Sequence, residues 1–312
     1  MWVEHELRAP RLDRPSAITI GGFDGVHRGH QALIGGMVAA AAEAGLRPVV
    51  VTFDPLPKQF FRRGEALLLA DLDERLERIA ALGVAGTIVL RFDAALAAMP
   101  AADFVAHLVG GLRMRLLWTG PDFAVGRGRE GDLDFLRAAG ARYGFALHVE
   151  PPYRWRGIVV RSTAIRQALH RADLALANAL LGRPYRLSGE VVHGLKRGRT
   201  LGFPTANLAP PAERLIPANG LYLCRAWVGE TVYAALTNIG TRPTFDHETV
   251  TVEAHLLDFD GDLYGRTLTL DFLRYLRPER RFPSAEALVA QINADVALAR
   301  RLWAEEGLGR QA

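Results

Sequence analysis

The feature that most limits the fold of this chain is a regular alternation of short apolar runs and longer helical segments through residues 16–180. The runs predicted as strands are 17–20, 48–52, 87–90, 116–119 and 146–149, and helices are predicted near 31–45, 73–82, 101–113 and 132–143. Such alternation is typical of a parallel sheet whose strands are joined by crossover helices. In an open sheet of this kind, ligands bind where the carboxyl ends of the strands meet.

The pattern changes after Leu181, where short strand-like segments replace the helices. These segments are 188–192, 220–228, 232–239, 249–257 and 267–272, with one helix predicted near 284–302. They indicate a small β-barrel followed by a terminal helix. A helix ending in Gly182 and Pro184 marks the change. The predicted fold class is α/β, with a Rossmann-like parallel-sheet domain at 1–182 and a β-barrel domain at 183–312.

Composition narrows the class of protein further. The 312 residues are 49% hydrophobic, which is enough for two buried cores. No apolar run reaches about 18 residues and no apolar signal core opens the chain, so we expect a cytoplasmic protein without a membrane partner. The net charge of +4 comes without a concentrated basic arm, which argues against nucleic acid as a partner. The only cysteine, Cys224, has strand-like neighbours and is expected to be structural.

A glycine-rich turn, residues 21–30 with the sequence GGFDGVHRGH, connects the first predicted strand to the first predicted helix. Its glycines let the backbone approach a ligand closely, and the free N–H groups that start a helix favour an anion. His27 and His30 add side-chain donors at the same place. These donors suit nucleotidyl transfer, in which negative charge grows on the α-phosphate and the leaving pyrophosphate. The alternative is an ordinary turn with two surface histidines.

Three later segments are predicted to complete this phosphate site. Residues 53–57, FDPLP, form a proline-fixed loop after the second strand. Residues 120–132 form a glycine- and arginine-rich loop whose arginines either hold phosphates or are simply solvated. Ser162 and Thr163 open a helix that one of them caps, and Arg166 follows one turn later, where it can face a triphosphate. An ordinary capped helix is the alternative for this last segment.

A second ligand site is predicted in residues 193–207, where three glycines and three basic residues precede the sequence PTAN. Thr205 and Asn207 stand two residues apart in an extended segment, so their side chains point to the same side. They offer two oxygen ligands suited to Mg²⁺ beside a nucleotide phosphate. The segment lacks the G-K-[ST] of a Walker A loop.

Glu253 lies in a predicted strand whose neighbours are mostly apolar. A carboxylate placed there can take the proton from a substrate hydroxyl as the hydroxyl attacks a γ-phosphate. A salt-bridged structural glutamate is the alternative, and this segment alone does not decide between the two.

Taken together, these motifs resemble the family of bacterial bifunctional riboflavin kinases/FMN adenylyltransferases, or FAD synthetases. The matching motifs are GFDGVHRGH at 22–30, F-x-P-x-P at 53–57, D-F-x-x-G-x-x-x-x-G-D at 122–132, S-T-x-I-R at 162–166, G-R-x-L-G-F-P-T-A-N at 198–207, N-I-G-x-R-P-T-F at 238–245, E-x-H-L-L-D-F at 253–259 and D-L-Y-G at 262–265. The resemblance covers nearly the whole chain. It implies that the barrel phosphorylates riboflavin to FMN and that the N-terminal domain adenylylates FMN to FAD, with pyrophosphate as the second product.

The resemblance also assigns roles to residues. It implies that His27 and His30 stabilise the ATP phosphates and that Glu253 is the general base for the ribityl 5′-hydroxyl. It implies a Mg²⁺ site at Thr205 and Asn207, with Mg²⁺ needed in both steps. The remaining residues implied to bind ATP or its phosphates are Gly22, Phe23, Asp24, Gly29, Asp122, Ser162, Thr163, Arg166, Gly194, Lys196 and Gly202.

Three positions depart from the family pattern. Ala70 replaces a usual threonine, Val125 stands where an aromatic residue is usual, and Arg161 stands where a serine is common. Two other functions stay open at this point. One is a different H-x-G-H nucleotidyltransferase with an unrelated β-domain, against which the PTAN segment and Glu253 argue. The other is a non-catalytic flavin- or RNA-binding regulator, against which the retained His27 and His30 argue. The sequence leaves open whether the chain forms a homo-oligomer.

Overall fold

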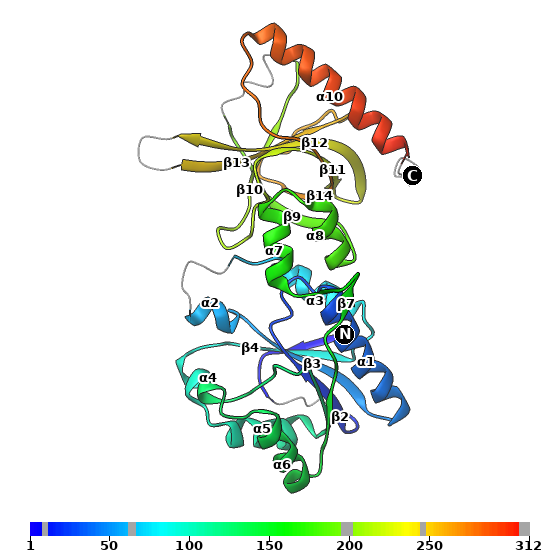
Figure 1. Cartoon of the computed structure of the whole chain (residues 1–312), viewed down its shortest axis with the longest axis vertical. Helices are drawn as coiled ribbons and strands as arrows, with labels where there is room; N and C mark the ends of the chain where they lie inside the picture. The colour runs from blue at the N-terminus through cyan, green and yellow to red at the C-terminus, as the bar shows by residue number, and fades with distance from the viewer. Residues whose placement is uncertain (8–11, 62–66, 195–201, 244–247, 306–312) are drawn as a thin grey trace. The chain divides into compact units, whose positions relative to one another are not determined.

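The computed structural model describes residues 1–7, 12–61, 67–194, 202–243 and 248–305, with the backbone alone at 242, 243, 248 and 249. The chain forms two compact units, Met1–Ser162 and Thr163–Ala312 (Figure 1). Each unit builds its own sheet and its own core.

The first unit contains a six-stranded sheet in which every neighbouring pair is parallel. Its strand order is β1 (Trp2–Glu4), β4 (Gly86–Leu90), β3 (Arg47–Phe53), β2 (Ser16–Ile20), β5 (Met114–Thr119) and β6 (Ala146–Val149). The five strands predicted from the sequence are all present, and β1 is an additional edge strand. The predicted parallel sheet is therefore confirmed.

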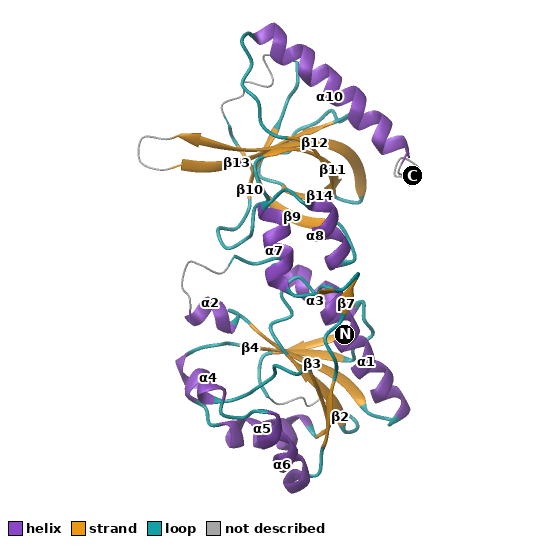
Figure 2. Ribbon diagram, in the orientation of Figure 1, coloured by secondary structure: helices purple, strands orange, loops and turns teal. Residues whose placement is uncertain are grey.

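Helices cover both faces of this sheet, as Figure 2 shows. On one face, Ile34 and Met37 of α1 (Arg28–Glu43) and Ile79 of α3 (Leu72–Ala80) pack with Val50. On the other face, side chains of α5 (Ala101–Leu112) and α6 (Leu133–Tyr143) pack with Val49 and its neighbours. Because both faces are covered, β2 and β4 are buried at every position instead of alternating between buried and exposed residues. Two short helices, α2 (Pro57–Phe61) and α4 (Ala94–Ala98), complete the crossovers.

The strand order places a switch point between β2 and β5. Strands β3 and β4 continue to one side of β2, whereas β5 and β6 continue to the other. The loops that follow β2 and β5 therefore leave the sheet edge in different directions and open a crevice between them. The glycine-rich turn at 21–30 follows β2, and the loop at 120–132 follows β5. After β6, a two-stranded hairpin, β7 (Arg154–Trp155) and β8 (Ile158–Val159), leads to the end of the unit.

The second unit is built around a closed barrel of antiparallel strands. The order around the barrel is β10 (Ala206–Ala209), β13 (Glu248–Leu256), β12 (Thr231–Pro243), β11 (Gly220–Val228), β14 (Thr267–Arg277) and β9 (Tyr185–Val192). Leu221 and Leu223 of β11 face the terminal helix α10 (Ala285–Glu305), where they pack with Ala299. The predicted barrel and terminal helix are confirmed, and the extended PTAN segment supplies the sixth strand.

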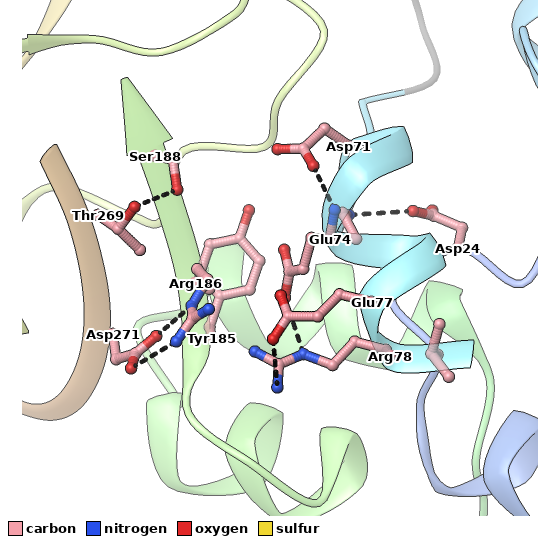
Figure 3. A network of polar contacts seen from close by, with 12 residues as sticks. Asp24, Asp71, Glu74, Glu77, Arg78, Tyr185, Arg186, Ser188, Thr269 and Asp271 are labelled. Atoms are coloured by element: carbon pink, nitrogen blue, oxygen red, sulfur yellow. Dashed lines mark hydrogen bonds and ion pairs between the residues drawn. The ribbon is translucent and has the colours of Figure 1, made fainter. Parts of the chain in front are cut away.

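The opposite face of β11 points into the barrel. Tyr222 and Cys224 are both fully buried there, and Cys224 lies opposite Phe272 of β14. Burial raises the pKa of the Cys224 thiol well above its usual value, so the thiol stays protonated. On the outer face, β9 and β14 are joined by polar pairs that Figure 3 shows: Arg186 to Asp271 at 2.7 Å and Ser188 to Thr269 at 2.9 Å.

The connection between the two sheets consists of helices α7 (Ser162–His170) and α8 (Leu174–Leu181). Helix α8 ends at Leu181, and Gly182 follows with a φ of 78°, a left-handed conformation that favours glycine. The predicted helix end is therefore confirmed. The compact units divide earlier, between residues 162 and 163, because α8 packs on β9 and β14 of the barrel. That residues 1–182 carry one activity and residues 183–312 the other stays a prediction.

Candidate active sites

His27 directly precedes helix α1, which begins at Arg28, three residues earlier than the sequence suggested. It is the N-cap residue: its Nδ1 accepts a hydrogen bond from the backbone N–H of His30 at 3.3 Å. Because Nδ1 accepts, the neutral ring carries its proton on Nε2, where it can be donated to a ligand. The side chain is only 4% exposed, so its position is fixed by the surrounding loop.

His30 stacks on His27, with ring centroids 3.6 Å apart and planes 17° from parallel. The ring of Phe23 meets it edge-on at 5.3 Å. Burial, followed by the charge that His27 would carry, lowers the pKa of His30 well below its usual value. His30 is therefore neutral near pH 7, and its Nδ1 is buried without a hydrogen-bond partner among the described residues. An anion bound here would favour the charged ring and oppose that shift.

A cavity of about 380 Å³ opens at the switch point of the sheet. Six residues predicted for the first site line it: Phe23, His27, Gly29, His30, Asp122 and Ser162. Segments more than a hundred residues apart in the sequence therefore meet at one place. The cavity also has walls that the motifs did not indicate, including Glu150 and Tyr153 after β6.

Gly29 leaves little room for a larger residue. A Cβ atom there would lie 3.0 Å from the carbonyl oxygen of Val160 and 3.2 Å from the ring of His27. The start of α1 is thus pressed against the segment that leads into α7. Gly22 contributes through its backbone, since its carbonyl accepts a hydrogen bond from Arg75 at 3.2 Å.

Asp24 is buried, and its carboxylate accepts hydrogen bonds from the backbone N–H groups of Leu69 at 2.8 Å and Ala70 at 3.3 Å. It thereby fixes the loop before α3. Ala70 takes part through its backbone N–H, which threonine would supply equally well. The carbonyl of Asp24 accepts a hydrogen bond from the hydroxyl of Ser162 at 3.1 Å. The prediction that Ser162 or Thr163 caps α7 stays a prediction, because a hydroxyl that donates one hydrogen bond can still accept another. A contact between Asp24 and ATP stays a prediction.

The arginines of the 120–132 loop bind the loop itself. Arg129 donates to the carbonyl of Asp122 at 2.6 Å, and Arg127 lies 3.6 Å from the carboxylate of Glu130. Neither arginine lines the cavity at the histidines. Val125, one of the departures from the family pattern, is buried in the core on the α5 and α6 side of the sheet. The loop therefore presents Asp122 to the cavity and keeps these two arginines in solvent-facing pairs.

Arg75 of α3 is a structural residue that sequence reasoning missed. It is 1% exposed, and it donates to the carbonyls of Phe53 at 2.9 Å and Gly22 at 3.2 Å. It thereby ties the loop after β3 to the loop after β2, with Asp54 at 3.7 Å as the nearby counter-charge. An arginine in a charged amphipathic helix gives no sequence signal for this role.

Thr163 and Arg166 lie on α7 after Ser162, in the part of the chain that belongs to the second compact unit. Ser162 itself belongs to the first unit and lines its cavity. The predicted roles of Thr163 and Arg166 in phosphate binding stay predictions.

In the barrel, a row of polar residues crosses three adjacent strands. Asn207 of β10 is in register with Glu253 of β13, and Glu253 is in register with Asn238 of β12. Directly opposed residues of antiparallel strands share one face of the sheet. The alternate residues Val252 and Ala254 are buried, so the row lies on the outer face. Strand register thus joins two predicted site residues, Asn207 and Glu253, and adds Asn238, which opens the motif at 238–245 but received no role from the sequence.

Thr205 immediately precedes β10 and lines a cavity of about 440 Å³, together with Pro204, Leu256 and residues of the 259–264 turn. Gly194 is in close contact with the row: a Cβ atom there would lie 2.3 Å from the side-chain amide nitrogen of Asn207. Gly202 has a φ of 84°, which favours glycine. Lys196 lies outside the described residues, so nothing about its position is tested.

The side-chain oxygen atoms of Thr205 and Asn207 are ligand types that Mg²⁺ prefers, with phosphate and water oxygens completing its shell. The residues present therefore fit a Mg²⁺ ion beside a nucleotide. Within the described part of the chain, no group of three His, Cys, Asp or Glu side chains forms a metal cluster of its own.

Comparison with known proteins bears on both sites. The family model described as FAD synthetase matches residues 9–164, and the one described as riboflavin kinase matches residues 181–303. A curated relative from Pseudomonas fluorescens, named bifunctional riboflavin kinase/FMN adenylyltransferase, is 43% identical over 302 residues, or 96% of each chain. A relative of the same name from Escherichia coli (strain K12) is 42% identical over 289 residues, or 92% of each chain.

A crystal structure titled macrolide-efflux protein from Streptococcus pneumoniae has the same fold. It aligns with a TM-score of 0.86 and 30% identity, covering 96% of this chain and 99% of the other. Among the described residues, no helix combines the length and the apolar character needed to cross a membrane.

Proposed function

Because the chain belongs to the family of bifunctional riboflavin kinases/FMN adenylyltransferases, we propose that it makes FAD from riboflavin in two successive ATP-dependent steps. The observation that carries this function is the order of the two family matches, each of which covers one of the two sites. ATP and the flavins are its substrates, with FMN the product of the first step and the substrate of the second.

The first step is placed at the polar row of the barrel. Glu253 takes the proton of the riboflavin 5′-hydroxyl as its oxygen attacks the γ-phosphorus of ATP. The bond from the γ-phosphorus to the bridging oxygen breaks, and ADP leaves. Asn207 lies beside Glu253 by strand register, so the phosphate-binding side of the site and the base are held by the same pair of strands.

The second step is placed in the cavity at the histidines. An oxygen of the FMN phosphate attacks the α-phosphorus of a second ATP, and pyrophosphate leaves. His27 donates from Nε2, and the free N–H groups at the start of α1 face the growing negative charge. His30 stacks on His27 and lines the same cavity. No covalent intermediate with the protein is required.

Mg²⁺ is proposed to serve both steps by neutralising phosphate charge. In the barrel, Thr205 and Asn207 would hold it. The functional boundary is proposed at 182/183, since the family matches end at 164 and begin again at 181. We place the reaction in the cytoplasm, because both steps consume ATP, and we propose no macromolecular partner.

The test is a chromatographic assay of the purified protein with riboflavin, ATP and Mg²⁺, repeated with FMN as the starting flavin. FMN followed by FAD is the expected result. FMN alone would mean that the first unit has lost adenylyl transfer. Flavin binding without any product would identify a non-catalytic regulator. If the protein neither binds a flavin nor converts one, a nucleotidyltransferase that acts on a different substrate becomes the better assignment.

A further inference from the structure

One cation in the wall of the N-terminal cavity belongs to none of the assigned motifs. Arg161 lines the cavity beside His27 and His30, and its Nη2 lies 2.9 Å from Oδ2 of Asp122. We propose that Arg161 binds a substrate phosphate during adenylyl transfer. Its ion pair with Asp122 breaks, and the guanidinium pairs with the phosphate instead. The inference rests on the proposed function, which places adenylyl transfer in this cavity.

The backbone on both sides of Arg161 is fixed against the glycine-rich turn. On one side, the carbonyl of Val160 sits where a Cβ atom on Gly29 would be only 3.0 Å away. On the other side, the hydroxyl of Ser162 donates to the carbonyl of Asp24 at 3.1 Å. The Arg161 side chain therefore starts from a backbone held at the phosphate-binding end of α1.

The charges of the cavity wall require a cation for an anionic ligand. Asp122 and Glu150 contribute two carboxylates, and Arg161 is the one Arg or Lys among the described residues of this wall. His30 is neutral near pH 7, because desolvation of its ring lowers its pKa. Without Arg161, the charged side chains of the wall would be acidic only, which opposes a triphosphate or an FMN phosphate.

The pair that Arg161 makes with Asp122 is suited to exchange. Both side chains are largely exposed, 61% for Arg161 and 74% for Asp122, and exposed ion pairs contribute little to stability. A phosphate offers several acceptor oxygens and more charge than one carboxylate, and the guanidinium can bind it in a bidentate manner. Arg129 holds the Asp122 backbone at 2.6 Å, so Asp122 keeps Arg161 at the cavity until the phosphate arrives.

The experiment measures FAD formation from FMN in Arg161→Ala, Arg161→Lys, Asp122→Asn and the double variant Arg161→Ala/Asp122→Asn. ATP is titrated at saturating FMN, and FMN at saturating ATP. We expect Arg161→Ala to raise one of the two KM values on the order of tenfold, also in the Asp122→Asn background. A rise for ATP identifies the triphosphate as the ligand, and a rise for FMN identifies the flavin phosphate. Arg161→Lys should recover part of the loss.

The matched control is Arg137→Ala. Arg137 forms a similarly exposed ion pair with Asp134 at 2.6 Å, and it does not line the cavity at the histidines. Its KM values should equal those of the wild type. Riboflavin phosphorylation should stay unchanged in every variant, which verifies that the protein is folded.

Two results would overturn the inference. If Arg161→Ala changes neither KM value, Arg161 does not bind phosphate. If the effect disappears in the Asp122→Asn background, Arg161 only neutralises Asp122. A separate variant, His30→Ala, tests the site itself: unchanged FAD formation there would remove adenylyl transfer from this cavity, a failure of the proposed function that is distinct from the other two.

Discussion

The two sites of this protein are assembled in different ways. In the first unit, one continuous turn supplies Phe23, His27 and His30, and later segments close around it. In the barrel, the polar row takes one residue from each of three strands, and Asn207 and Glu253 meet only because β10 and β13 pair in one register. A parallel sheet thus offers a site at the ends of its strands, whereas an antiparallel barrel offers one along its surface. We therefore expect that either site can be disabled while the other still works.

The largest effect is expected from Glu253→Gln. The amide keeps the shape of the carboxylate but cannot accept the proton of the 5′-hydroxyl, so kcat for FMN formation should fall by about 10²–10⁴. Conversion of FMN to FAD should stay at the wild-type rate. Initial rates from the two starting flavins measure both quantities. A folded variant that loses both activities would break the comparison, since one site would then serve both steps.

His30→Ala should produce the opposite pattern. Removing the ring takes away the stacking partner of His27 and one wall of the cavity, so FAD formation from FMN should fall on the order of 10²-fold or more. Phosphorylation of riboflavin should be unaffected. The same two assays provide the measurement, and slowed phosphorylation in a stable variant would argue against separate sites.

Gly194→Ala sharpens the comparison within the barrel. The added Cβ would lie 2.3 Å from the amide nitrogen of Asn207, so the amide must move. We expect the Mg²⁺ concentration for half-maximal kinase rate to rise roughly tenfold, because a proposed ligand of the ion is displaced. The Mg²⁺ dependence of FAD formation in the same preparation is the internal control. An unchanged Mg²⁺ dependence of the kinase would contradict the role given to Asn207.

Two glycines of α1 form a matched pair for the first unit. Gly29→Ala should slow FAD formation roughly tenfold, because the new methyl displaces Val160 or His27 by a few tenths of an ångström. Gly35→Ala meets nothing within 4 Å and should leave the rate unchanged. It should instead stabilise the helix by about 0.5–1 kcal/mol, measured by chemical unfolding. Equal rates in the two variants would show that the close approach at Gly29 is not needed.

The smallest effect is on stability in acid. His30 has a lowered pKa in the folded state, so below its unfolded pKa the unfolded chain binds a proton that the folded chain rejects. Stability should therefore fall as the pH drops below about 6.5, by up to about 1.4 kcal/mol between pH 7.5 and 5.5. Chemical unfolding of the wild type and of His30→Gln at the two pH values measures this. An equal loss in both proteins would mean that His30 does not contribute.

Much of the fold could be predicted from the pattern of apolar residues, because buried strands and amphipathic helices each require a characteristic spacing of apolar side chains. The edge strand β1 could not, since Trp2–Glu4 is only three residues long and ends in a charged residue. Strand β10 was recognised as extended, but its place between β9 and β13 depends on barrel closure, which no local pattern encodes.

The sites show the same division. The turn at 21–30 carries its chemistry in adjacent residues, so its cavity was predicted from the sequence. The sequence assigned no role to Asn238 or Arg75. The place of Asn238 depends on the pairing of β12 with β13, and that of Arg75 depends on a contact with Phe53, which is distant in the sequence. Asp24 is predicted from the sequence to bind ATP, and the structure adds a second use of its carboxylate, which accepts hydrogen bonds from the backbone of Leu69 and Ala70. A carboxylate in a motif gives no sequence signal that separates these two uses.

Cys224, buried inside the barrel, makes the chain its own reporter of local opening. It is the only cysteine of the 312 residues, it has no exposed surface, and burial raises the pKa of its thiol. A thiol reagent can reach it only when β11 separates from its neighbours. The rate of labelling therefore measures the opening of the kinase barrel alone. A flavin or nucleotide that slows labelling stabilises the closed barrel.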